Sequence, residues 1–194
     1  MNADDPEYLN QHVIARHSAV SYDWLEVASR KVSLKFYSSD VKRLFTRHFH
    51  AFQISVLSLG NAQEKDLWRL RAGTPYLDEI AAHISSTMEM VELEIQWIQA
   101  LITVPSFEIC RPANPLELTV RIFSGHVASY LMLLHRIDDL LVWLAHLAQC
   151  RVIDIREQAR LRAQLKSSAA SLARLATKSA RALQASLHKR SASP

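Results

Sequence analysis

Residues 29–45, SRKVSLKFYSSDVKRLF, decide how this chain is organised. In the first half apolar and polar side chains alternate, the apolar being Val32, Leu34 and Phe36 and the polar Lys31, Ser33, Lys35 and Tyr37. A period of two is typical of a strand that buries one face. Candidate N-caps follow at Ser38, Ser39 and Asp40, and apolar residues then recur at helical spacing to about Leu59. The stretch therefore predicts a short strand that passes directly into a helix.

A second stretch, LELTVRIFS at 116–124, alternates in the same way, with Thr119 and Arg121 among its polar positions. Elsewhere apolar residues recur every three or four positions. This spacing predicts helices over about 22–27, 41–59, 64–104, 126–150 and from 153 onward, with a break at AGTP, residues 72–75. Two short strands cannot make a stable sheet alone, so they must pair with each other, with a second chain, or with both. We expect a mainly α fold with two short β-strands in a ribbon-helix-helix-like element, and a homodimer.

The length of 194 residues fits one domain with appended segments. We expect an N-terminal arm and short helix at 1–29, a helical core with the β-ribbon at 30–175, and a basic C-terminal helical tail at 176–194. Hydrophobic residues make up 49% of the chain and there are only 3 glycines, which is the profile of a folded, helix-rich protein.

Two cysteines, Cys110 and Cys150, cannot form a disulfide framework, and we therefore expect a reducing, cytoplasmic setting. The most apolar segment, residues 130–148, carries Arg136, Asp138 and Asp139 near its centre. Charged residues at that depth favour a core helix over a membrane span, so we expect no membrane partner.

Positive charge is concentrated in two parts of the chain. Residues 151–194 hold ten Lys/Arg and two acids, a formal charge of +8, whereas residues 1–150 hold 13 basic and 17 acidic residues, a formal charge of −4. Residues 30–50 form a second basic segment, in which six Lys/Arg stand against Asp40 alone. Basic segments on a mildly acidic body suggest an anionic partner such as nucleic acid, although a solvated helix face explains many basic runs.

No motif in the sequence argues for an enzyme, a cofactor or a metal ion. His48 and His50 are two positions apart on a predicted helix and so do not share a face. Asp138 and Asp139 have no second carboxylate motif beside them, and we interpret them as a structural or interface pair with basic neighbours such as His135. The three glycines stand alone and form no phosphate-binding loop.

A two-stranded ribbon fits the major groove of DNA, where its outward side chains can reach base edges. The predicted outward residues of the two strands are Lys31, Ser33 and Lys35, and Thr119 and Arg121. Further predicted DNA contacts are Arg30, Lys42, Arg43 and Arg47, with Arg43 and Arg47 one helical turn apart to bind flanking phosphates. The structural alternative is an edge strand whose lysines only prevent aggregation.

The partner expected from these features is double-stranded DNA. A dimeric helical scaffold, whose basic tail binds an acidic protein, remains as the alternative function. The tail is a basic amphipathic segment that suits DNA, an acidic protein, an anionic membrane surface or the protein's own acidic body.

The order of these segments resembles the AcaB-like transcriptional regulator family of conjugative plasmids and integrative conjugative elements. The resemblance covers about residues 30–175. It rests on the early strand, the DLWRLR segment, the second strand ending at Ser124, and the pairs Tyr130–Leu131, Asp139–Leu140 and Ile153–Asp154. It implies ribbon-helix-helix DNA binding and a role in conjugative transfer. Many members have proline where this chain has Gly125, and the AGTP break also departs from the family pattern.

Overall fold

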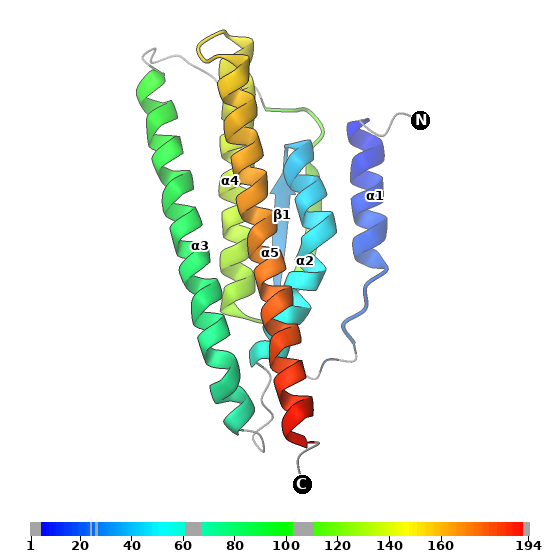
Figure 1. The fold of residues 1–194 in the computed structure, drawn as a ribbon. Coiled ribbons are helices and arrows are strands. Elements are labelled where there is room, and N and C mark those ends of the chain that lie inside the picture. The colour runs from blue at the N-terminus through cyan, green and yellow to red at the C-terminus, as the bar shows by residue number, and fades with distance from the viewer. Residues whose placement is uncertain (1–4, 24, 26, 61–66, 103–110, 192–194) are drawn as a thin grey trace.

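The computed structural model describes residues 5–23, 25, 27–60, 67–102 and 111–191. Within them the elements follow in the order α1 (Pro6–Ser18), β1 (Arg30–Phe36), α2 (Ser39–Gly60), α3 (Leu67–Leu101), β2 (Leu116–Ile122), α4 (Gly125–Gln149) and α5 (Ile155–Ser191). The predicted mainly α fold with two short strands is confirmed (Figure 1). Residues 176–191 continue α5 without a break, so the predicted tail and the last core helix form one element.

The two strands pair with each other, antiparallel, within one chain. The register runs from Arg30 opposite Ile122 to Phe36 opposite Leu116, so the two strands are matched over their whole length. The pairing of the two strands with each other, one of the possibilities open from the sequence, is thus present in the structure. Apolar side chains alternate inward along both strands because successive side chains in a strand point to opposite faces.

The helices form two layers beneath the ribbon. The inner face of the ribbon packs on α2 and α4, where Phe36 of β1 lies 5.7 Å from Phe45 of α2 between ring centroids. Phe52 of α2 stacks on Tyr130 of α4 at 4.2 Å. On the other side of this layer α5 packs mainly against α2 and also against α3 and α4. Figure 1 shows α5 in front and β1 behind, so the ribbon and α5 cover opposite sides of the α2–α4 layer.

The first helix is in a different place from the one expected at 22–27. It begins at Pro6, with the side chain of Asp5 accepting a hydrogen bond from the Glu7 amide, which is a favourable start signal. Tyr22 is buried outside any helix, 5.2 Å from the Phe123 ring, and its hydroxyl group lies 2.8 Å from His50. The apolar residues near 22 therefore cover the ribbon end instead of forming a helical face. Trp24 lies outside the described residues.

The break expected at residues 72–75 is absent, because α3 continues through Pro75. The glycine in this segment, Gly73, has a packing role. A Cβ at this position would collide with the backbone carbonyl of Leu59, at the end of α2, and would lie 3.1 Å from its carbonyl carbon. Glycine is therefore needed for α3 to pass close to α2, and it does not end the helix.

Asp138 joins α4 to the segment between β1 and α2. Its two carboxylate oxygens accept hydrogen bonds from the backbone amides of Tyr37 and Ser38, each at 2.7 Å, and its side chain is fully buried. Its partners are therefore backbone amides and not the basic neighbours expected from the sequence. His135 lies 3.7 Å from Asp139 instead. No helix among the described residues has the length and apolar character needed to cross a membrane.

Candidate nucleic-acid interface

The outer face of the ribbon carries six polar side chains in three cross-strand pairs, all of them exposed or half-buried. The register places Lys31 opposite Arg121, Ser33 opposite Thr119, and Lys35 opposite Glu117. The five predicted outward residues of the two strands thus lie together on one surface, as the alternation predicted. Arg30 is also exposed, although the alternation along β1 puts it on the same face as the inward residues, because it lies at the end of the ribbon.

The charges of this face are only partly balanced. Lys35 pairs with Glu117 at 2.7 Å, and the hydrogen bond from Lys35 to Glu117 raises the pKa of the lysine. Arg121 lies 3.4 Å from Asp23. Both pairs are solvent-exposed, so an anionic partner can displace them at little cost. Lys31 lies directly across from Arg121, an unfavourable like-charge pair that an added phosphate would stabilise.

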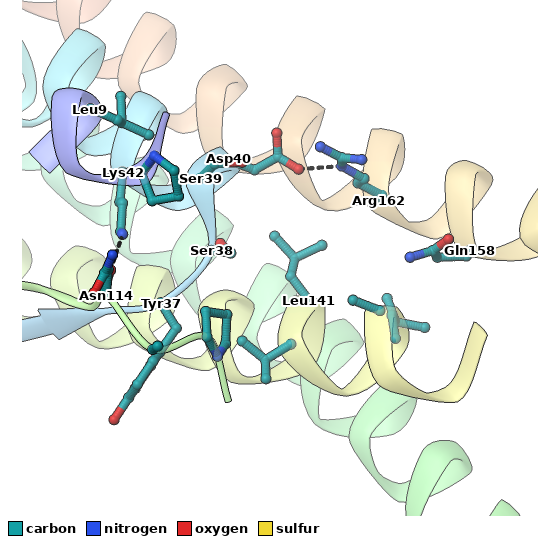
Figure 2. A pocket seen from close by; sticks show the side chains of 16 residues that line it. Leu9, Tyr37, Ser38, Ser39, Asp40, Lys42, Asn114, Leu141, Gln158 and Arg162 are labelled. Atoms are coloured by element: carbon teal, nitrogen blue, oxygen red, sulfur yellow. Dashed lines mark hydrogen bonds and ion pairs between the residues drawn. The ribbon is translucent and has the colours of Figure 1, made fainter. Parts of the chain in front are cut away.

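Lys42 is a correction to the predicted interface. Its side chain is only 2% exposed and its ammonium group donates a 2.8 Å hydrogen bond to the Asn114 carbonyl, as Figure 2 shows. Burial lowers the pKa of this lysine. Lys42 therefore cannot reach DNA in this structure. The sequence pattern does not distinguish Lys42 from its exposed neighbours, because its hydrogen-bond partner, Asn114, lies 72 residues away along the chain.

Arg43 and Arg47 lie on the side of α2 that faces away from Phe45. Phe45 faces the ribbon through its contact with Phe36. Each residue of a helix is rotated by about 100° from the last, so positions two before and two after Phe45 point to the opposite side of α2. The predicted contacts of Arg43 and Arg47 with phosphates that flank the ribbon stay a prediction.

Arg47 borders a second basic surface, the α2–α5 groove, which the sequence did not predict. It is a hollow of about 350 Å³ whose basic residues are His48, Arg174, Lys178 and Arg181. Burial lowers the pKa of His48, and the positive charges of Arg174 and Arg47 lower it further. Among the described residues, Arg174, Lys178 and Arg181 form no salt bridge. Predicting this groove from the sequence requires knowing how α5 packs on α2, and helical periodicity alone does not show this.

No group of three or more His, Cys, Asp or Glu side chains in the described part of the chain is arranged to hold a metal ion. The outer face of the two-stranded ribbon carries basic and hydroxyl side chains, together with Glu117. The basic and hydroxyl side chains can donate hydrogen bonds to phosphate oxygens and to the acceptor atoms of bases.

Together, the ribbon and its helical support define a class of mainly α proteins with an exposed antiparallel β-ribbon. The crystal structure of AcaB from uropathogenic E. coli has this fold. It matches our structure with a TM-score of 0.73 over 86% of each chain, at 20% sequence identity. The AcaB-like resemblance is thus confirmed at the level of fold.

No family model and no curated protein matches the chain. Two of the segments that carried the resemblance differ in what the structure says of them. The side chains of DLWRLR, residues 66–71, all lie outside the described ones, whereas Tyr130 and Leu131 are buried core residues of α4.

Proposed function

We propose that the chain is a sequence-specific DNA-binding transcriptional regulator that inserts the outer face of the β1–β2 ribbon into the major groove. The observation that carries the proposal is the exposed surface of Lys31, Ser33, Lys35, Thr119 and Arg121 on a single ribbon. A two-stranded ribbon has the right width for the major groove, and Lys or Arg can pair with guanine there. The proposed function is non-enzymatic.

The electrostatics of the ribbon support this proposal over an edge strand that only resists aggregation. An edge strand needs one or two lysines, whereas this face has a cross-strand pair of like charges. Lys31 and Arg121 repel each other, and the exposed Asp23 offsets only part of their charge, so an added anion would stabilise the pair. The AcaB-like fold is consistent with a regulator of a conjugative element, and we include that role in the proposal.

The test is a fluorescence-anisotropy titration of the protein with duplex DNA from its own upstream region and with a scrambled duplex. Lys31→Ala and Arg121→Ala are each expected to weaken binding and to reduce the salt slope by about 1, as the loss of one phosphate contact does. Arg156→Ala is the matched control because Arg156 is an exposed arginine at the start of α5, on the other side of the helical layer. If all three variants bind the duplex with the same affinity and the same salt slope, the ribbon does not bind DNA.

A dimeric scaffold is the second candidate function, and one observation favours it. Leu93 of α3 is 65% exposed and Met132 of α4 is 59% exposed, and both line one hollow of about 680 Å³. Exposed apolar side chains that gather in one place are typical of protein contacts. Light scattering of the protein and of a Leu93→Lys, Met132→Lys variant tests the scaffold. A scaffold that assembles through this hollow loses its assembly in the variant, whereas a DNA reader that does not use the hollow keeps its oligomeric state.

A further inference from the structure

A cavity of about 470 Å³ lies at one end of the ribbon. In an antiparallel pair the end of the first strand and the start of the second are neighbours, and here Phe36 is opposite Leu116. The cavity is lined by the residues that come directly after β1, Tyr37 to Ser39, and by those that come before β2, Pro112 to Asn114. We call it the junction pocket. Its volume lies within the ~300–1,000 Å³ of small-molecule sites.

Lys42 places a buried cation in the wall of the junction pocket (Figure 2). Its ammonium group has three donors, and the partner that the structure shows for it among the described residues is the Asn114 carbonyl. A buried charge is stabilised by a partner of opposite charge. An anionic group in the pocket would accept further hydrogen bonds from this ammonium group and neutralise its charge.

The other charged residues of the pocket leave it with an excess of positive charge. Asp40 is 5% exposed and accepts hydrogen bonds from Arg162 and from Lys166, the latter at 3.1 Å. Burial raises the pKa of Asp40, but these two cations outweigh burial and lower it, so the carboxylate stays ionised. One acid is thus shared by two cations, and Lys42 adds a third. Asp138 acts on Lys42 at longer range, and counting it as ionised still leaves an excess of one positive charge.

The remaining wall is apolar. Leu9 of α1 and Leu141 and Leu144 of α4 contribute to it, and Figure 2 shows Leu141 between the Lys42–Asn114 pair and Gln158. A cation at one end and leucines along one side suit a molecule with an anionic head and a short hydrocarbon body. We propose that the junction pocket binds a small amphipathic carboxylate, with its head toward Lys42 and its body against the α4 leucines.

The position of the pocket links its occupancy to the ribbon. A bound molecule would contact both segments that attach the ribbon to the helices, those at 37–39 and 112–114. If the ligand prefers one orientation of the ribbon, it changes DNA affinity, and DNA changes the affinity for the ligand by the same factor. This second step rests on the proposed DNA-binding function, whereas binding of the carboxylate does not.

The first experiment measures the melting temperature of the full chain with sodium hexanoate, and with hexanamide as the uncharged control. At a tenfold excess of hexanoate over its Kd, we expect the melting temperature to rise by about 3–6 °C. Hexanamide should cause no rise. Lys42→Met should abolish the response, and so should Ala145→Phe, which fills the pocket from α4. Lys31→Met, on the ribbon, should respond like the original chain. Circular dichroism establishes that each variant is folded.

The second experiment repeats the DNA titration with hexanoate at saturation, where a DNA affinity that changes at least fivefold is expected. No shift with hexanoate, or an equal shift in a folded Lys42→Met variant, would overturn the proposed site. A shift in melting temperature without a change in DNA affinity would overturn the link to the ribbon. If the chain binds no DNA, the proposed function fails while the melting experiment still decides whether the pocket binds a carboxylate.

Discussion

Asp138 of α4 accepts a 2.7 Å hydrogen bond from the backbone amide of Ser38, although 100 residues separate them. The same carboxylate accepts a bond from the neighbouring amide of Tyr37. These amides belong to the junction between the ribbon and α2, where neither strand nor helix provides a backbone partner. One buried side chain therefore fixes the direction in which the ribbon leaves the helical layer.

Removing this side chain should loosen the junction. Asp138→Ala leaves two part-buried amides without their acceptor, and we expect it to lower the free energy of unfolding by about 3 kcal/mol. Asp138→Asn keeps one oxygen acceptor and should cost less. Urea denaturation monitored by circular dichroism measures both changes. A loss below that of an exposed substitution such as Arg156→Ala would show that the two bonds contribute nothing.

The sequence predicted the ribbon well because a strand with one buried face has a simple signature. The alternation from Lys31 to Phe36 correctly assigned the inward and outward side chains, and the helical spacing placed α2, α4 and the start of α5 within a few residues. These features depend on neighbours in the chain. Local periodicity is enough to predict them.

Contacts between distant segments could not be predicted in this way. Whether Lys42 is exposed depends on the segment before β2, which lies 72 residues away at Asn114. The side of α2 that carries Arg47 is known only once α5 is placed beside it. The continuation of α3 through Pro75 was missed for a similar reason, since Gly73 serves a contact with α2. Packing between segments far apart in the chain decides the exposure of Lys42, the surroundings of Arg47 and the continuation of α3.

Gly73 offers a direct test of this contact. Alanine is the better helix former by about 1 kcal/mol, so Gly73→Ala would stabilise an isolated helix. Here its Cβ would collide with the Leu59 carbonyl, and we expect a net loss of about 1–3 kcal/mol as the two helices move apart. Thermal unfolding of this variant gives the answer. A higher melting temperature would mean that α2 and α3 do not approach each other as closely as described.

Gly125 should behave in the opposite way. It is the first residue of α4, and a Cβ there would meet nothing within 4 Å. The preceding Ser124 is extended, with φ −153° and ψ 160°, which is compatible with a following proline. Proline at this helix position loses no hydrogen bond, and Gly125→Pro should raise the free energy of unfolding by about 0.4–1 kcal/mol. A measurable loss in urea denaturation would contradict the described start of α4.

The α2–α5 groove predicts a pH effect. Burial lowers the pKa of His48 below 6.5, and Arg174 and Arg47 lower it further. The unfolded chain therefore binds a proton at His48 before the folded chain does, so this residue's contribution to stability is lost as the pH falls below 6.5. Arg174→Gln should raise the pKa of His48, measured by NMR titration of its ring protons, and Arg156→Gln should not. If the pKa of His48 is the same in the Arg174→Gln protein, the described packing of α5 on α2 is contradicted.

The most direct test of the central claim is the salt dependence of DNA binding by the Lys31→Ala, Arg121→Ala double variant. The predicted result is a loss of preference for the native upstream duplex over the scrambled one, with a salt slope reduced by about 2 relative to the original chain. The Arg174→Ala, Arg181→Ala variant carries the same change in charge in the α2–α5 groove and should keep that preference. If the groove variant loses the preference and the ribbon variant keeps it, the ribbon is not the surface that reads DNA.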